Sequence, residues 1–249
     1  MIILKSDKEI ALMRKAGRIV AYVWEKLKER VRPGISGEEL NSYAEELILE
    51  KGAIPVFKGH QGFPAAICVS TNEIVVHGIP SKKELKEGDI VSLDIGAKYK
   101  GYCGDGAITL PVGTVSPEAR RLICVTRNSL FEAIKQAKPG NHISDISWAV
   151  QSCVEKQDFS VIRKFTGHGI GKDIHEDPKI PNFGKPHQGP VLKKGMVFCI
   201  EPMVSTGGYE VEISSDGWTA TTKDKSLSAH FEHMVAITDK GVEILTESS

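Results

Sequence analysis

The sequence predicts an α+β fold in which two related halves each contribute a pair of helices and a set of antiparallel strands. Helix-start signals occur twice in each half, and short apolar runs separated by glycine turns follow each pair, which is typical of antiparallel strands. Segments of the first half also recur in the second. Because no linker or change in composition separates the halves, we expect one domain spanning residues 1–249, with repeats at about 1–112 and 113–249.

The four predicted helices are located by their N-terminal residues. Ser6 with Glu9, and Ser36 with Glu39, form the pattern of a capping box, in which side chains satisfy free backbone N–H groups. The first helix carries an apolar stripe at helical spacing. The other two start signals are an N-cap serine with a first-turn proline, Ser116-Pro117, and the turn Pro139-Gly140.

The internal repeat places two acidic residues at equivalent positions. RPGISGEELNSYAEELI (32–48) resembles KPGNHISDISWAVQSCV (138–154), and KEGDIVSLD matches KKGMVFCIE almost apolar residue for apolar residue. The second match aligns Asp94 with Glu201. Each half therefore delivers a carboxylate from the same strand position, and we expect a metal site on the pseudo-twofold axis between the halves.

Four carboxylates and one histidine lie in apolar, strand-like or glycine-flanked settings, where an uncompensated charge is costly. We expect them to meet around metal ions, and carboxylate oxygens with one imidazole suit two hard or borderline divalent cations. The absence of thiolate ligands argues against a structural zinc site and favours a hydrolytic two-metal centre. The five residues are Asp94, Asp105, His168, Glu201 and Glu232.

The local sequence indicates how these side chains are presented. Asp94 and Asp105 lie on two predicted strands joined near residues 98–101, so a hairpin brings both carboxylates to one region. Glu201 ends an apolar strand before a proline, and Glu232 interrupts another strand. His168 lies between two glycines, where we expect the backbone to come close to a ligand.

Composition excludes several classes of protein. The 249 residues are 41% hydrophobic, which is enough for a substantial core, and 32 basic residues balance 32 acidic ones, so no broad charged surface for nucleic acid or anionic membrane is expected. Five cysteines without a CxxC pair predict reduced thiols and a cytoplasmic protein. We find no apolar run suited to a signal peptide or a membrane span.

The motifs NEIVVHGIP, DIGAKYKGYCGD, GHGIGKDIHEDP, GMVFCIEPMV and HFEH resemble those of the methionine aminopeptidases, in their short bacterial type I form. The resemblance covers nearly the whole chain in the right order. It implies the pita-bread (creatinase/aminopeptidase) fold and metal-dependent hydrolytic removal of the initiator methionine, with a preference for a small second residue. It also implies nascent polypeptide N-termini starting with Met as partners, transient ribosome association, and a monomer.

The resemblance further implies roles for the metal-binding residues. His168 and Glu201 would bind one metal, Asp94 would chelate the other, and Asp105 and Glu232 would bridge them. The cofactors would be two divalent ions, of which Co, Mn, Fe and Zn are all compatible with such ligands.

Catalytic and substrate-binding roles are implied in the same way. Glu201 resembles the proton shuttle of the family, His175 the histidine that stabilises the carbonyl oxygen, and His77 one that contacts the substrate near the scissile bond. The residues that would line the methionine pocket are Phe63, Cys68, Phe198 and Trp218. The sequence departs from the family pattern at His60, where tyrosine is common and which would lie at the pocket rim, and at Ile174 and Met234.

Two other functions are compatible with this fold. An Xaa-Pro aminopeptidase or prolidase uses an equivalent set of five ligands, but such chains usually carry a large additional N-terminal domain. A metal-free binding module, associated with ribosomes or RNA, would keep the fold and lose the ligands. All five ligands are present here.

Overall fold

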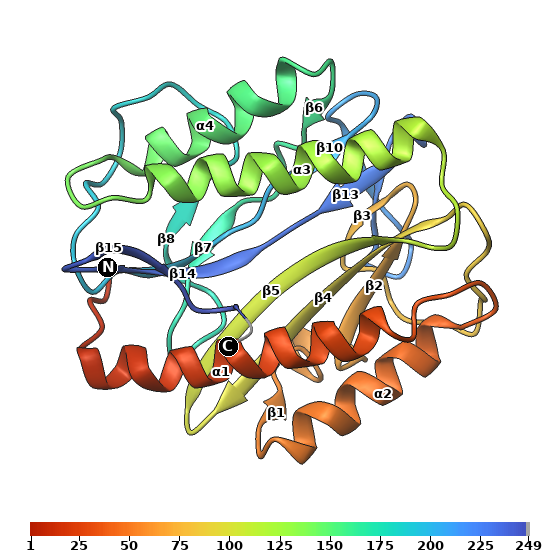
Figure 1. Ribbon diagram of the computed structural model, residues 1–249, viewed down its shortest axis with the longest axis horizontal. Coiled ribbons are helices and arrows are strands. Elements are labelled where there is room, and N and C mark those ends of the chain that lie inside the picture. Colours follow the sequence, from red (N-terminus) through yellow and green to blue (C-terminus); the bar gives the residue numbers. More distant parts are fainter. Residues whose placement is uncertain (248–249) are drawn as a thin grey trace.

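A computed structural model of the protein describes residues 1–247. Two pairs of helices flank a central set of strands, with α1 and α2 on one side in Figure 1 and α3 and α4 on the other. The helices are α1 (Asp7–Lys28), α2 (Gly37–Glu50), α3 (Pro117–Gln136) and α4 (Ile143–Glu155).

The strands form four sheets, and every strand pairing is antiparallel. In the first half, β4 (Ile90–Tyr99) pairs with β1 (Ile54–Pro55), β2 (Ile67–Thr71) and β5 (Tyr102–Pro111). In the second half, the largest sheet has the order β15-β14-β9-β7-β8, made of Gly241–Ile244, His233–Thr238, Val197–Ile200, Gly167–Gly169 and Glu176–Ile180.

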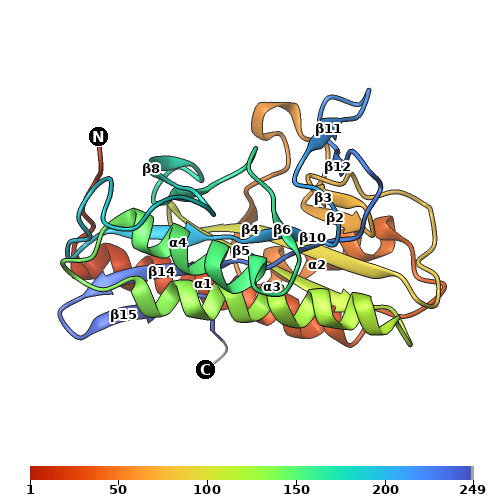
Figure 2. The same cartoon turned by 90° about the horizontal axis from the view of Figure 1, so that it is seen from above.

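Two smaller sheets complete the strands. One has the order β13-β10-β6, formed by Ser228–His230, Met203–Ser205 and Ser160–Val161. The other has the order β11-β12-β3, formed by Val211–Ile213, Ala220–Thr222 and Ile74–Val76, so it joins strands from both halves. Viewed from above, α1, α2 and α3 lie along one side of the molecule, whereas β8 and the β11–β12 hairpin project from the opposite side (Figure 2).

The helix starts predicted from the sequence are confirmed. Ser6 and Ser36 are N-caps, and each forms a complete capping box with the glutamate three residues later. The Ser116 side chain accepts a hydrogen bond from the N–H of Ala119, and Pro117 occupies the first turn. The fourth helix begins after His142, two residues beyond Gly140.

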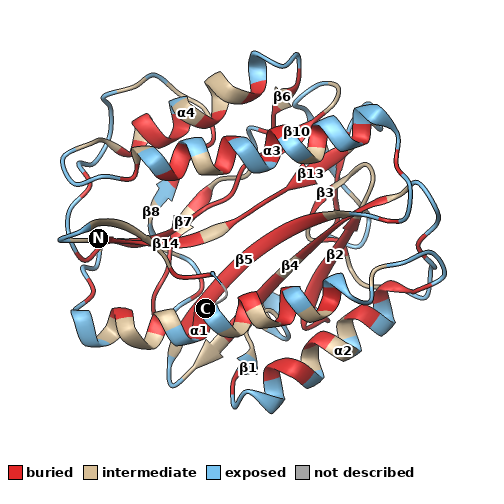
Figure 3. Ribbon diagram, in the orientation of Figure 1, coloured by how far each residue is buried: buried red, intermediate tan, exposed pale blue. Residues whose placement is uncertain are grey.

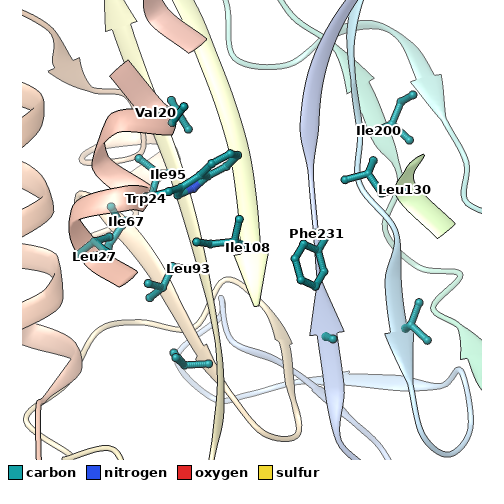
Figure 4. Close-up of a cluster of buried hydrophobic side chains, with 14 of the residues drawn as sticks. Val20, Trp24, Leu27, Ile67, Leu93, Ile95, Ile108, Leu130, Ile200 and Phe231 are labelled. Carbon is teal, nitrogen blue, oxygen red and sulfur yellow. The ribbon is translucent and has the colours of Figure 1, made fainter. Parts of the chain in front are cut away.

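The central strands and the inner faces of the helices are buried, and the outer helix faces are exposed (Figure 3). The largest cluster of buried side chains includes residues of both halves. In Figure 4, Trp24 and Ile108 of the first half lie beside Phe231 of the second, with Leu130 and Ile200 beyond. The described structure confirms the predicted α+β class, whereas the division of the repeats near residue 112 stays a prediction.

Small residues allow α1 to approach β5 closely. A Cβ atom at Gly104 would lie 2.6 Å from the backbone of Ala16 and of Gly17, and one at Gly106 would lie 2.5 Å from the Trp24 ring. Such distances leave no space for a side chain on this face of the strand. Because side chains alternate along a strand, the residue between these two glycines, Asp105, points to the opposite face.

Backbone and hydroxyl hydrogen bonds connect the two halves beside this strand. The N–H of Glu232 donates to the carbonyl oxygen of Ala107 at 2.8 Å. The Thr109 hydroxyl donates to the carbonyl of His230 at 2.7 Å and accepts from its N–H at 2.9 Å. The segment that carries Glu232 is therefore fixed directly against the strand that carries Asp105.

Within the described residues, no helix is both long enough and sufficiently apolar to cross a membrane.

The close contact around α1 predicts that Gly17→Ala destabilises the protein. Alanine improves helix propensity over glycine by about 1 kcal/mol. Against this, the new Cβ atom would lie 2.2 Å from the carbonyl oxygen of Leu245, a backbone atom that cannot rotate away. Overpacking costs about 1–3 kcal/mol, and so short a contact with backbone belongs at the upper end of this range, so we expect a net loss of about 2 kcal/mol in the free energy of unfolding, measured by chemical denaturation.

Gly208→Ala is the matched control for this prediction. Gly208 has no positive φ, and its nearest neighbour would lie at an ordinary contact distance of 3.5 Å. We expect a change within about 0.5 kcal/mol. Equal stability of the Gly17→Ala protein and the parent would contradict the close packing of α1 described above.

Candidate metal centre

A cavity of about 640 Å³ lies between the two halves and is lined by residues of both. All five metal ligands predicted from the sequence line it. One side of its wall is apolar and aromatic, and the other is formed by carboxylates and imidazoles. The lining residues that carry this division are Phe63, Cys68, His77, Asp94, Asp105, His168, His175, Glu201, Trp218, His230 and Glu232.

The predicted hairpin delivers two of the carboxylates. Strands β4 and β5 pair so that Asp94 lies opposite Ala107 and Asp105 opposite Gly96. Opposite residues share a face, as do residues two apart along a strand, so both carboxylates point to the same side of the hairpin. The tight turn at Lys100 and Gly101 has positive φ at both positions, 47° and 86°, which sets this register.

His168 lies in β7, and the role expected for its flanking glycines is corrected. A Cβ atom at Gly167 would lie 2.3 Å from the carbonyl oxygen of Cys199, and one at Gly169 would lie 2.0 Å from that of Asp177. The glycines therefore let the backbones of strands β9 and β8, rather than a ligand, approach β7. The ring is oriented by Nδ1, which lies 3.0 Å from the carbonyl oxygen of Gly169, so Nε2 faces the carboxylates.

Glu201 and Glu232 lie at neighbouring strand ends. Glu201 follows β9 directly, and Pro202 separates it from β10. Glu232 lies in the two-residue connection between β13 and β14. His233 of β14 pairs with Ile200 of β9 in an antiparallel arrangement. Glu232, which precedes His233, is therefore brought close to Glu201, which follows Ile200.

The distances show which groups converge. His168 Nε2 lies 3.6 Å from Asp105 Oδ2 and 3.4 Å from Glu201 Oε1. Two overlapping sets of residues could each hold a metal ion. Within each set, one ligand atom from every residue lies within 4.8 Å of the others, and Glu232 belongs to both sets. Asp94 belongs to neither set, although it lines the same cavity. The sets are Asp105, His168, Cys199 and Glu232, and Glu201, His230 and Glu232.

The carboxylates are buried without partners. Asp105, Glu201 and Glu232 are 3%, 9% and 2% exposed, and each of these residues and Asp94 has one buried oxygen without a hydrogen bond. Burial raises the pKa of Asp94 to about 7. Burial, and then the neighbouring carboxylates, raise the pKa of Asp105, Glu201 and Glu232 well above the ordinary range.

This combination fits divalent cations. Buried polar atoms are nearly always hydrogen-bonded, so several unpartnered oxygens facing one another indicate a missing positively charged ligand. Carboxylate oxygens and imidazole nitrogens are the donors that such cations accept in catalytic sites. The donor set therefore matches a metal centre rather than a structural ion pair.

His230 is part of this centre and was missed by the sequence analysis. It is 2% exposed, and its Nε2 is buried without a hydrogen bond, 3.8 Å from Glu201 Oε2 and 3.9 Å from Glu232 Oε2. Burial lowers its pKa to about 3, so the ring is neutral at pH 7. The available signal was its position two residues before Glu232 in an extended segment, which puts both side chains on one face.

Cys199 is a second residue that the sequence did not reveal. It lies two residues before Glu201 and shares its face, whereas the intervening residue points the other way. Burial, and then Glu232, raise the pKa of this thiol well above its ordinary value, so it stays protonated. Its neutral thiol lies within the cluster of possible ligand atoms, but the residue is not among those that line the cavity.

The same alternation corrects the expectation for Phe198. Its side chain is fully buried in the main core and does not line the cavity, because it points to the opposite face of β9 from Cys199 and Glu201. Ile174 and Met234 are also absent from the cavity wall. Both pack in a smaller buried cluster with Ile10 and Met13 of α1.

The apolar side of the cavity contains the other expected pocket residues. Phe63, Cys68 and Trp218 belong to one cluster, and the rings of Phe63 and Trp218 meet edge to face at 5.2 Å. The Trp218 ring also lies 6.3 Å from that of His77. Burial, followed by Asp94, raises the pKa of the Cys68 thiol well above its usual range. The cavity therefore has an apolar surface made of two aromatic rings and a neutral thiol.

Two histidines lie between the acidic and apolar sides. The ring centroid of His175 is 4.5 Å from that of His168 and 5.6 Å from that of His60. Burial of the rings lowers the pKa of both His77 and His175, assisted by His175 and His60, respectively. His77 has a φ of 59°, an uncommon conformation for a non-glycine residue that is often found at functional sites.

Comparison with known proteins agrees with these features. The sequence profile of metallopeptidase family M24 matches residues 11–239. Methionine aminopeptidase 1 of Bacillus subtilis is 53% identical over 246 residues, which is 99% of each chain. The crystal structure of a methionine aminopeptidase from Thermotoga maritima superposes with a TM-score of 0.98 at 47% identity and is covered completely, as is this chain.

The comparisons also separate this chain from the prolidases. Prolidase from Pyrococcus furiosus shares the fold with a TM-score of 0.81 but is 25% identical, and only 66% of its chain is covered. Members of family M24 use divalent metal, in agreement with the buried ligand cluster. The chain belongs to metallopeptidase family M24 and, within it, to the short bacterial type I methionine aminopeptidases.

Proposed function

We propose that this protein hydrolytically removes the initiator methionine from nascent proteins and peptides, with a preference for a small second residue. The observation that carries the proposal is one cavity in which buried, unpartnered carboxylates face an apolar wall containing sulfur and aromatic rings. The acidic side suits metal-assisted hydrolysis, and the apolar side suits a methionine side chain.

Two divalent cations are the proposed cofactors, with Mn, Fe, Co or Zn bound according to supply in the cell. His168 and Glu201 would hold one, Asp94 the other, and Asp105 and Glu232 both. His230 is not assigned as a ligand, but its neutral ring closes the cluster beside Glu201 and Glu232. When bound, the cations would lower the pKa of a water molecule towards neutrality and polarise the scissile carbonyl.

The residues around the centre have complementary roles in this proposal. Glu201 faces the cavity with an unpartnered Oε1, so its carboxylate can accept a proton and deliver it to the leaving amine. His175 and His77 have lowered pKa values and are neutral at pH 7. A neutral ring N–H can donate to the substrate carbonyl oxygen as negative charge develops there without adding a second charge beside the cations.

The residues that line the cavity support the proposed specificity for methionine followed by a small residue. Phe63, Cys68 and Trp218 would enclose the methionine side chain, with His60 at the rim. The second residue would then lie beside the histidines and carboxylates, where bulky side chains are disfavoured. The proposed partners of the protein are nascent polypeptide N-termini that start with Met.

We also propose that the protein acts as a monomer in the cytoplasm and contacts the ribosome transiently. All five cysteines are free in the described structure, and three of them are buried. Reduced thiols are the ordinary state in a cytoplasmic compartment, which supports this location.

The first test is substrate specificity. We expect cleavage of Met-Ala-Ser, Met-Gly and Met-Ser peptides, and a kcat/KM at least about tenfold lower for Met-Leu peptides, because steric mismatch in an enclosed site costs about this much. Release of free methionine, quantified by chromatography, is the measurement. Faster cleavage of Ala-Pro than of Met-Ala peptides would instead identify an Xaa-Pro aminopeptidase.

Metal removal is the second test. We expect exhaustive chelation to reduce peptidase activity to background, and Mn, Fe, Co or Zn to restore it, because the cations would activate the water. Elemental analysis of the chelated protein verifies metal removal, and circular dichroism verifies that it remains folded. Full activity of a demonstrably metal-free, folded protein would exclude a metal-dependent mechanism.

The third test addresses the shared ligand. Glu232→Gln keeps the side-chain size but removes the charge, so we expect lower metal occupancy and at least about a 100-fold lower rate of cleavage. Loss of a residue that only hydrogen-bonds to a metal ligand already lowers metal affinity or activity by about 10- to 100-fold. The control is Glu212→Gln, which breaks an exposed ion pair with Lys225 outside the cavity. Normal metal content and activity of Glu232→Gln would remove Glu232 from the ligand set.

A further inference from the structure

A buried ion pair lies directly behind the catalytic cavity. The side chain of Lys5 is 4% exposed and that of Glu176 is 10% exposed, with Nζ and Oε2 separated by 2.5 Å. Lys5 Nζ also donates to the carbonyl oxygen of Ile3 at 3.2 Å. Glu176 lines the cavity, whereas Lys5 does not. A lysine buried this deeply requires a fixed partner, and the pair is therefore held in one arrangement.

Both partners are anchored to the framework of the site. The N–H of Lys5 donates to the carbonyl oxygen of Gly195 at 2.7 Å, immediately before the segment that leads into β9 and Glu201. Gly171 leaves room for the pair, since a Cβ atom there would lie 2.4 Å from Glu176 Oε1 and 2.6 Å from Lys5 Cε. The carbonyl oxygen of Gly171 in turn accepts from the N–H of Cys103, two residues before Asp105, at 2.8 Å.

Glu176 controls the segment that presents His175. It follows His175 directly, starts β8, and pairs with Gly169, the residue after His168. Its Oε1 accepts a hydrogen bond from the N–H of Asp173 at 3.4 Å, which closes the loop of residues 171–176. His175 itself is exposed on its solvent side and has no side-chain hydrogen bond in the described structure, so its ring position depends on this backbone.

We propose that Lys5 is a positioning residue for the reaction, which fixes the loop of residues 171–176 through Glu176 and thereby holds the His175 ring beside the metal-binding residues. The inference rests on the catalytic role proposed above for His175. A displacement of about 1 Å in a catalytic group is enough to cost about 100-fold in rate, so a tether one residue away from that group affects turnover without touching the substrate.

The test is a set of variants assayed on a Met-Ala peptide with the metal-loaded enzyme. We expect Lys5→Met to lower kcat about tenfold or more, with KM changed less than about twofold and metal content unchanged. His175→Ala should lower kcat about 100-fold. If Lys5 acts through His175, adding Lys5→Met to His175→Ala should lower kcat no further.

Controls separate positioning from a loss of folding. Arg14→Met breaks a second ion pair between the N-terminal part of the chain and a distant glutamate, Arg14–Glu243, which does not line the cavity, and should leave kcat unchanged. Lys5→Met with Glu176→Met removes both charges, so the protein should regain thermal stability while kcat stays low.

Three results would overturn the proposal. They are a kcat loss in Arg14→Met equal to that in Lys5→Met, recovery of kcat when Lys5→Met is combined with Glu176→Met, and a kcat loss from Lys5→Met that is the same in the parent and in the His175→Ala protein. A normal kcat for His175→Ala alone would instead refute the role proposed for that histidine.

Discussion

Four carboxylates that face one cavity without enough partners are the constraint on which the rest of the structure depends. Burial and mutual repulsion oppose their ionisation, as the raised pKa values of Asp94, Asp105, Glu201 and Glu232 indicate. Divalent cations resolve this conflict, because they supply the positive charge that the surrounding imidazoles, which are neutral, do not. A cluster of this kind requires a rigid framework. In a flexible one, the carboxylates would move apart and become hydrated, and their repulsion would fall without any cation.

Close backbone packing provides that rigidity. Gly104 and Gly106 bring α1 against one face of β5, so Asp105 is pressed towards the cavity, and Gly167 and Gly169 bring neighbouring backbone against β7 around His168. Hydrogen bonds between Ala107 and Glu232 join the two halves at the same level. The ligands are thus held on strands or at strand ends, where backbone pairing limits their movement more than a loop would.

The cavity separates two requirements of the chemistry. Its acidic side holds charge, and its apolar side, with Phe63, Cys68 and Trp218, excludes it. His77 and His175 lie between the two sides with pKa values that burial lowers, so both rings are neutral at pH 7. Of the buried pair beside the site, Glu176 lines the cavity and Lys5 does not, so Lys5 acts on the site through Glu176 and the backbone that carries His175.

Local patterns in the sequence determined the helix starts, the β4–β5 hairpin and the five candidate metal-binding residues, because capping boxes, turn glycines and isolated polar residues in apolar or glycine-flanked segments are properties of neighbouring residues. Only the tertiary structure decided what covers each face of β9, because both faces are apolar and the side chains that bury them come from distant segments. Cys199 therefore lies at the site, whereas Phe198 lies in the core. The purpose of the glycines beside His168 and the pairing of Lys5 with Glu176 likewise depend on contacts between segments far apart in the chain, for which no local signal exists.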